Sequence, residues 1–215
     1  QFTVIKGEKN KLLLLNCGTL EYKHLSLDLQ NYKIVLLNSN VNHNLATSEY
    51  NIRRYECEQA LKIIQKEYSE YIYLANVPET IIKSLREKMP EKVYSRAMYV
   101  SQENTRTLKG ALLIEEGKVQ DFGLLMYQTH KGLSEKYEVS SPELDFLVNL
   151  TKDMTKVIGS RLMGGGFGGC TINLIKSNLK EDFISYVKDK FHDKYDYDIK
   201  IETVSFSSGL DIVTF

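Results

Sequence analysis

The chain has 215 residues, 42% of them hydrophobic and 26% charged, which is the composition of an ordinary globular protein of one or two domains. Basic and acidic residues number 28 each, so no overall field favours nucleic acid or a membrane surface as a partner. The apolar runs, such as Leu12–Leu15, are too short to span a bilayer, and no secretory leader opens the chain. Three scattered cysteines argue against a disulfide framework or a zinc site and favour a reducing, cytoplasmic compartment.

The first part of the chain predicts strands and then a helix. We expect strands at Phe2–Ile5 and Lys11–Cys17, joined by a turn, and a third at Lys33–Asn38. Apolar residues then recur at helical spacing from Tyr50 to Tyr68, with Arg53 among the charged residues of the opposite face.

The rest of the chain predicts further helices before the sheet resumes. The expected helices are Pro78–Met89, Val93–Glu116, Val119–Leu133, Pro142–Val157 and Lys180–Phe191. The expected strands are Cys170–Ile175, Lys200–Phe206 and Leu210–Phe215. Gly117 suits a helix C-terminus, and Ser141-Pro142-Glu143 is a strong helix start. This order predicts an α+β sandwich of ferredoxin type with extra helices.

Five of the 13 glycines fall between Gly164 and Gly169, in a segment that we expect to join a helix to a strand. A Walker A loop is excluded, because Cys170 stands where its lysine should be. A dinucleotide-binding loop needs a strand before it and a helix after it, which is the reverse of the expected order. Two interpretations remain: a backbone nest that holds anionic oxygens or packs against a second loop, and a tight turn without a ligand.

Three segments of the chain match motifs of one known family. Residues 159–171 read GSRLMGGGFGGCT and resemble the third signature motif of the GHMP kinases, in the form found in galactokinases. Residues 38–41 (NSNV) with 48–54 (SEYNIRR) resemble the entry into its C-terminal domain, and residues 137–145 (YEVSSPELD) resemble the segment before the motif-three helix. The resemblance runs in order over nearly the whole chain. It implies a GHMP-kinase C-terminal domain at residues 41–215, preceded at residues 1–40 by strands of the N-terminal domain.

The same resemblance implies that part of the family pattern lies outside the chain. The sugar-binding Gly-Glu-His-x-Asp motif and the serine-rich phosphate-binding motif do not occur here. The catalytic aspartate of the family sits in a Met-Asp-Gln-Phe run, so it would immediately precede Gln1. We therefore expect a C-terminal portion of a galactokinase that carries no catalytic residue and no metal ligand, and that is inactive alone. Its exposed strand edges would invite a dimer that is an artefact of truncation.

The implied reaction is phosphorylation of galactose at its anomeric hydroxyl by ATP with Mg²⁺, both bound mainly by the N-terminal domain. Tyr50 matches the tyrosine that contacts the sugar. Gly164, Gly165, Gly166, Gly168 and Gly169 would support the phosphate-binding loop. Two alternatives stay open: a galactokinase-like sugar sensor without turnover, and a GHMP kinase for another small molecule, such as N-acetylgalactosamine, mevalonate or homoserine.

Several candidate residues have ordinary structural interpretations as well. Arg53 and Arg54 could bind phosphate, although paired arginines on a helix are more often solvated or salt-bridged. His43 and His130 could act as acid–base groups but match no motif, and Cys170 is better explained as a small residue at a strand start than as a reactive thiol. Asn42 stands where many galactokinases carry arginine, which leaves the sugar preference open.

Overall fold

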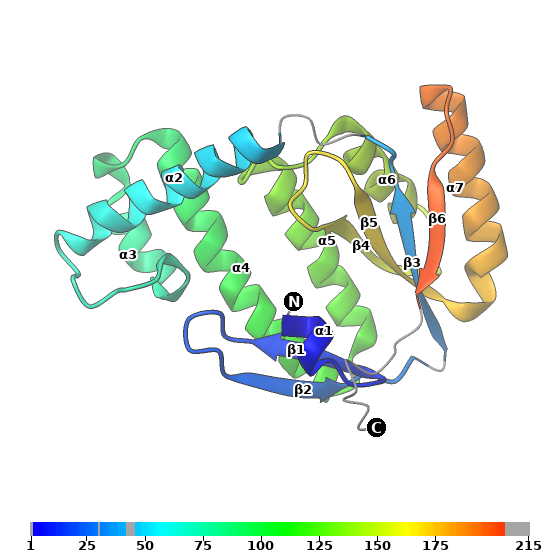
Figure 1. The fold of residues 1–215 in the computed structure, drawn as a ribbon, viewed down its shortest axis with the longest axis horizontal. Helices are drawn as coiled ribbons and strands as arrows, with labels where there is room; N and C mark the ends of the chain where they lie inside the picture. The colour runs from blue at the N-terminus through cyan, green and yellow to red at the C-terminus, as the bar shows by residue number, and fades with distance from the viewer. Residues whose placement is uncertain (1, 30, 42–45, 205–215) are drawn as a thin grey trace, which may run out of the picture.

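The computed structural model describes residues 2–29, 31–41 and 46–204, and Figure 1 shows the arrangement of its elements. A short helix and a hairpin come first, and a central sheet flanked by helices forms the larger part. The helices are α1 (Phe2–Lys6), α2 (Ala46–Gln65), α3 (Glu79–Ser84), α4 (Glu91–Glu115), α5 (Val119–Glu135), α6 (Pro142–Lys152) and α7 (Lys180–Tyr195). The strands are β1 (Lys11–Leu15), β2 (Tyr22–Ser26), β3 (Tyr32–Asn38), β4 (Val157–Met163), β5 (Cys170–Lys176) and β6 (Lys200–Val204). Short 3₁₀ turns lie at η1 (Leu74–Asn76), η2 (Arg86–Lys88) and η3 (Ser177–Leu179).

The central sheet has the order β4-β5-β3-β6, and every neighbouring pair is antiparallel. Chain order gives a helical segment between β3 and β4 and helix α7 between β5 and β6. That is the ferredoxin-type arrangement, in which two strands from opposite ends of the domain lie side by side. The expected α+β fold with additional helices is confirmed. The division of the chain at residue 40 stays a prediction, and β3, which precedes it, lies inside this sheet.

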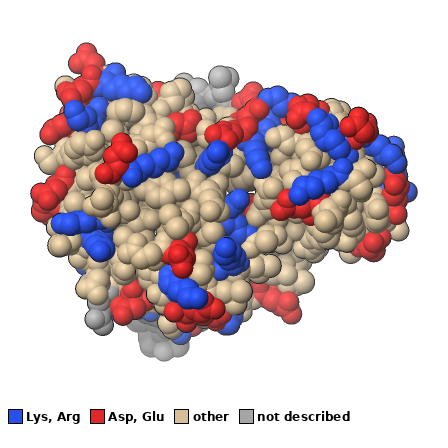
Figure 2. Space-filling view, turned by 180° about the vertical axis from the view of Figure 1, so that it is seen from behind, with Lys and Arg blue, Asp and Glu red and all other residues tan. Residues whose placement is uncertain are grey.

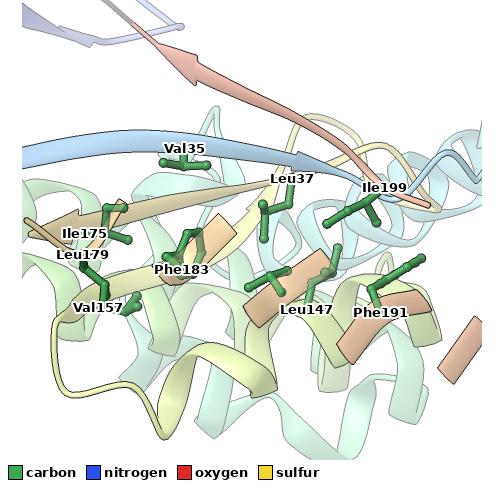
Figure 3. Packing of buried hydrophobic residues seen from close by; sticks show 10 residues of the cluster. Val35, Leu37, Leu147, Val157, Ile175, Leu179, Phe183, Phe191 and Ile199 are labelled. Atoms are coloured by element: carbon green, nitrogen blue, oxygen red, sulfur yellow. The ribbon is translucent and has the colours of Figure 1, made fainter. Parts of the chain in front are cut away.

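Each face of the sheet is covered by helices because alternate side chains of its strands are apolar. Val35, Leu37 and Ile175 pack against Phe183 and Phe191 of α7 and against α6 (Figure 3). On the other face Ile34, Ile158 and Leu174 contact Val119 and Met126 of α5.

A second core lies among the helices away from the sheet. Its members come from α2, α3, α4, the turn η1 and the residues that directly follow η1 and α3, and include Ala60, Ile64, Val77, Ile82, Leu85, Val93 and Ala97. The β1–β2 hairpin packs through Leu25 and Leu27 on Ile114 near the end of α4. In Figure 1 the hairpin lies below α4 and α5, at a distance from the central sheet.

Two signals for helix ends are confirmed. The hydroxyl of Ser141 accepts a hydrogen bond from the Leu144 amide at 3.3 Å, which caps α6. Gly117 follows α4 with φ of +69°, a conformation that glycine adopts without a Cβ penalty.

The N-terminal strand prediction was wrong. Phe2–Ile5 belongs to helix α1, which buries none of its residues. A β-branched run needs a paired neighbour to form a strand, and β1 pairs instead with β2, a strand that the sequence pattern did not predict. The expected strand Lys11–Cys17 exists but ends at Leu15.

The helix expected over Pro142–Val157 was also too long. Helix α6 ends at Lys152, and Val157 opens strand β4. The apolar pattern of this strand is interrupted by Gly159, Ser160 and Arg161, so the sequence pattern did not predict a strand here. The buried Ser160 hydroxyl is satisfied by the side-chain oxygen of Asn173, at 2.6 Å.

Smaller differences concern element ends. The helix expected at Pro78–Met89 is split into α3 and η2 around Leu85. Strand β6 is described to Val204, and the strand expected at Leu210–Phe215 lies outside the described residues. Asn42 and His43 lie outside them too.

Candidate functional site

The glycine-rich segment is the turn of a β-hairpin. Met163 at the end of β4 pairs with Cys170 at the start of β5, and Gly164–Gly169 connects them. The expected helix-to-strand loop was therefore wrong: strands lie on both sides. A dinucleotide-binding loop is still excluded, because a strand rather than a helix follows the glycines. We call residues 164–169 the glycine loop.

Positive φ angles explain most of the glycines in this loop. The values are +84° at Gly164, +81° at Gly166, +128° at Gly168 and +78° at Gly169, and Phe167 between them has +59°. A side chain with a Cβ is strained in this region, so the sequence uses glycine at four of the five positions.

The second half of the glycine loop is held by close backbone contacts. A Cβ on Gly166 would lie 1.9 Å from the carbonyl oxygen of Val139, which leaves no room for a side chain. The Phe167 amide donates a hydrogen bond to the same oxygen at 2.7 Å. Ser39, just after β3, donates from its amide and its hydroxyl to the carbonyl of Gly169, at 2.8 and 2.9 Å. This half is packed and fixed.

The first half of the loop is open. A Cβ placed on Gly164 or Gly165 would meet no atom within 4 Å among the described residues. These two residues can therefore approach a ligand or another segment closely. The loop has a fixed base and a free tip.

Tyr50 lies in the first part of α2 with 54% of its surface exposed. One helical turn later Arg53 reaches the glycine loop, and its guanidinium carbon lies 5.9 Å from the centre of the Phe167 ring. Figure 1 shows the loop between β4 and β5 beside the N-terminal end of α2. The structure thus brings the helix of Tyr50 and the glycine loop together.

Arg53 itself was expected on the solvent face of its helix, and this was wrong. Only 7% of the residue is exposed. Its Nε donates to the Tyr137 carbonyl at 2.7 Å and its Nη2 to the Glu138 carbonyl at 2.9 Å. Arg54 is exposed and pairs with Glu58 at 2.9 Å, one turn along the same helix. Both arginines are engaged by protein groups.

His130 is a buried structural residue. Its Nδ1 accepts the Leu162 amide at 3.2 Å, so Nε2 carries the proton and faces Asp145 Oδ1 at 3.1 Å. Burial raises the pKa of Asp145, but the hydrogen bonds from His130, Ser140 and Ser134 together lower it by more, so the pKa falls below its ordinary value. Cys170 is partly buried, and this desolvation raises the pKa of its thiol, which disfavours the reactive thiolate.

The sequence did not reveal a second buried arginine near the loop. Arg96 of α4 is 1% exposed and donates to Glu56 at 2.8 Å and to Glu138 at 2.9 Å. An arginine within an amphipathic helix that carries several other charged residues gives no signal of this kind in the sequence. Its partners come from α2 and from the connection between α5 and α6.

A hollow of about 890 Å³ lies elsewhere, between α1, β1, α4 and α5. Its wall is largely apolar, and the charged residues among its lining are Glu8, Lys11, Glu103, Arg106 and Arg161. Tyr50 and the glycine loop are not among the described residues that line it. The hollow is therefore separate from the site that the sequence indicates.

Charge and metal-binding groups are spread rather than gathered. Basic and acidic side chains alternate over the face drawn in Figure 2. Within residues 2–29, 31–41 and 46–204, His, Cys, Asp and Glu side chains form no group of three or more that could hold a metal ion. In the same ranges each helix is too short or too polar to cross a bilayer.

Comparison with known proteins gives a consistent result. Residues 111–193 match the model of the GHMP kinase C-terminal domain. Galactokinase from Clostridium acetobutylicum is 39% identical over 210 residues, which are 97% of this chain and 54% of that protein. Galactokinase from Thermotoga neapolitana is 34% identical, over 98% of this chain and 57% of its own length.

Solved structures agree with the sequence comparison. The crystal structure of Lactococcus lactis galactokinase complexed with galactose has a TM-score of 0.92 and 30% identity, over 97% of this chain and 54% of that one. The mevalonate kinase of L. major, at 18% identity and a TM-score of 0.55, shares the fold alone. The chain spans about half the length of these relatives. Residues 111–193 thus match the GHMP kinase C-terminal domain, and the chain is similar to galactokinases over nearly its whole length.

Proposed function

We propose that this chain is part of a galactokinase, which transfers the γ-phosphoryl group of ATP to the anomeric hydroxyl of galactose. The observation that carries the proposal is the similarity to galactokinases over 97% of the chain, in sequence and in fold. Contact between the glycine loop and the helix of Tyr50 supports it. The cytoplasm, where ATP is available, is the proposed compartment.

In this proposal the chain contributes one wall of the substrate cleft. Tyr50 contacts the sugar, for which its exposed phenol is suitably placed. Gly164 and Gly165, at the free tip of the glycine loop, approach the phosphate-binding loop of the complete protein. The packed half of the glycine loop, with Gly166, Gly168 and Gly169, holds that tip in place.

The catalytic base and the metal ligands are assigned to the part of the complete protein outside this chain. Phosphoryl transfer depends on a metal ion that neutralises phosphate charge and on a group that accepts the proton of the attacking hydroxyl. The described residues do not fit a Mg²⁺ site, since their His, Cys, Asp and Glu side chains form no group of three or more that could hold a metal ion, and we derive no step through a metal held here. The chain alone is therefore expected to be inactive.

The test is ADP release by the complete gene product with Mg·ATP and galactose, N-acetylgalactosamine, mevalonate or homoserine supplied separately. Turnover on galactose alone is the expected result. Saturable galactose binding without turnover would indicate a sugar sensor, and turnover only on another substrate would indicate a GHMP kinase of different specificity. Galactose phosphorylation by the 215-residue chain alone would contradict the assignment of the catalytic groups.

A further inference from the structure

In the connection between α5 and α6, four consecutive backbone carbonyl groups accept hydrogen bonds from arginine side chains, a serine hydroxyl or a backbone amide. Arg96 Nη1 donates to the Lys136 carbonyl, and Ser95 Oγ donates to the same oxygen at 3.1 Å. Arg53 donates to the next two carbonyls, those of Tyr137 and Glu138, at 2.7 and 2.9 Å. The fourth carbonyl, that of Val139, accepts the Phe167 amide of the glycine loop at 2.7 Å. Two guanidinium groups thus fix the backbone directly before the residue that holds the loop.

The two arginines share their counter-charges. Glu56 Oε2 lies 2.8 Å from Arg96 Nε and 3.8 Å from Arg53 Nη1. Glu138 Oε2 lies 2.9 Å from Arg96 Nη2 and 4.0 Å from Arg53 Nη2. Glu49 adds a third carboxylate at 3.3 Å from Arg53. The arginines are buried while the Glu49 and Glu138 carboxylates are partly exposed. Ion pairs to buried groups add little net stability over apolar residues, but they require one particular geometry.

Arg53 contacts the glycine loop from a second direction. Its guanidinium lies over the ring of Phe167, and the backbone amide of Phe167 donates the hydrogen bond to the Val139 carbonyl. The backbone of Glu138, which Arg53 also holds, has φ of +54°, a conformation unfavourable for glutamate without outside support. Substitution of Arg53 therefore loosens both partners of the Val139–Phe167 hydrogen bond. It frees the backbone directly before Val139 and removes the contact with the Phe167 ring.

We propose that Arg53, supported by Arg96, is a positioning residue that holds the Val139 carbonyl and through it the glycine loop in register with α2, the helix of Tyr50. Its consequence for catalysis rests on the proposed function, because only there do Tyr50 and the loop act on one substrate pair. Its structural part does not. We call the contacts of Arg53 with the Tyr137 and Glu138 carbonyls and with the Phe167 ring the clamp, and loss of the clamp should change the hydrogen exchange of the Phe167 amide whatever the reaction.

The experiment compares Arg53→Lys, Arg53→Met and Arg54→Met in the complete protein. Lysine keeps the positive charge but loses the fork that reaches two carbonyls at once. Arg54→Met removes a neighbouring arginine whose pair among the described residues is the exposed one with Glu58, and serves as the matched control. Amide hydrogen exchange is followed for the Phe167 amide and for buried amides of α7.

Both Arg53 variants are expected to speed exchange at Phe167 by about tenfold or more, because a charge-assisted hydrogen bond contributes enough for that factor. Exchange within α7 should stay unchanged, and Arg54→Met should match the wild type throughout. Wild-type exchange at Phe167 in Arg53→Lys would overturn the proposal, as would equal acceleration at Phe167 and α7.

Kinetics then test the catalytic part. In Arg53→Lys we expect kcat on galactose to fall about tenfold, with sugar binding changed less, since Tyr50 remains on a folded helix. Faster exchange at Phe167 with an unchanged kcat would overturn the catalytic role and leave the clamp. Absence of galactose turnover in the wild type would refute the proposed function, while the exchange result would still decide the clamp.

Discussion

Gly123 of α5 and Gly159 of β4 touch backbone to backbone. A Cβ built on Gly159 would lie 2.6 Å from the Gly123 Cα, and one built on Gly123 would lie 2.2 Å from the Ile158 carbonyl oxygen. The helix can lie this close to the sheet only because both residues lack a side chain. Since β4 leads directly into the glycine loop, this contact also places the start of the loop.

Gly123→Ala is therefore expected to destabilise the protein by about 1–3 kcal/mol, because the new methyl group must push α5 away from β4. Gly110→Ala is the matched control in a neighbouring helix. Its Cβ would meet the Phe122 ring at 3.4 Å and the Leu125 side chain at 3.7 Å, both ordinary contacts, and alanine favours the helix by up to about 1 kcal/mol. Thermal unfolding of the complete protein measures both. Equal stability of the two variants would contradict the close approach.

The charge on Glu138 gives a prediction for acid conditions. Hydrogen bonds from Arg96 and Lys92 lower its pKa from 4.5 to about 2. Its contribution to stability is therefore fully present above pH 4.5 and is lost as the pH falls towards 2. Glu138→Gln should lower the urea midpoint at pH 7, and its difference from the wild type should shrink steadily below pH 4.5. A difference that is constant from pH 7 to pH 3 would show that the carboxylate charge contributes nothing.

Local pattern was sufficient for the elements whose signals lie within one segment. The apolar spacing of α4 and α5, the Ser141 cap and the glycine after α4 all have local physical causes, and each is found where expected. The resemblance of residues 159–171 to a family motif likewise needs no tertiary information. The glycine loop was located correctly, although the element before it was not.

The errors have a tertiary cause. Strand β4 carries Gly159 and Ser160 in its interior, and both are tolerated only because of partners elsewhere, Gly123 and Asn173. Arg53 is buried because carbonyl groups 84 and 85 residues further along the chain meet its guanidinium. No window of sequence around Arg53 contains that information, so a charged residue was placed on the solvent face.

Tyr50→Phe tests the proposed sugar contact. The phenol is exposed, so removal of its hydroxyl should change the free energy of unfolding by less than about 0.5 kcal/mol. If the hydroxyl bonds the sugar, KM for galactose should rise about five- to tenfold, with KM for ATP nearly unchanged. Tyr55→Phe, on the same helix and 59% exposed, is the control and should keep wild-type kinetics. Identical KM values for galactose in the two variants would remove Tyr50 from the site.

Gly166→Val tests the fixed half of the glycine loop. Valine at φ of +81° costs at least about 1–2 kcal/mol, and its Cβ would also occupy the space of the Val139 carbonyl oxygen, 1.9 Å away. The loop must then leave Val139, so we expect galactose phosphorylation by the complete protein to fall at least tenfold even where the variant folds. Gly165→Ala is the control for the base of the loop, because its Cβ meets no described atom within 4 Å and its φ is not positive. That variant should keep wild-type stability, so any loss of turnover it shows reports on what approaches the free tip. A folded Gly166→Val protein with unchanged turnover would mean that the contact with Val139 has no part in catalysis.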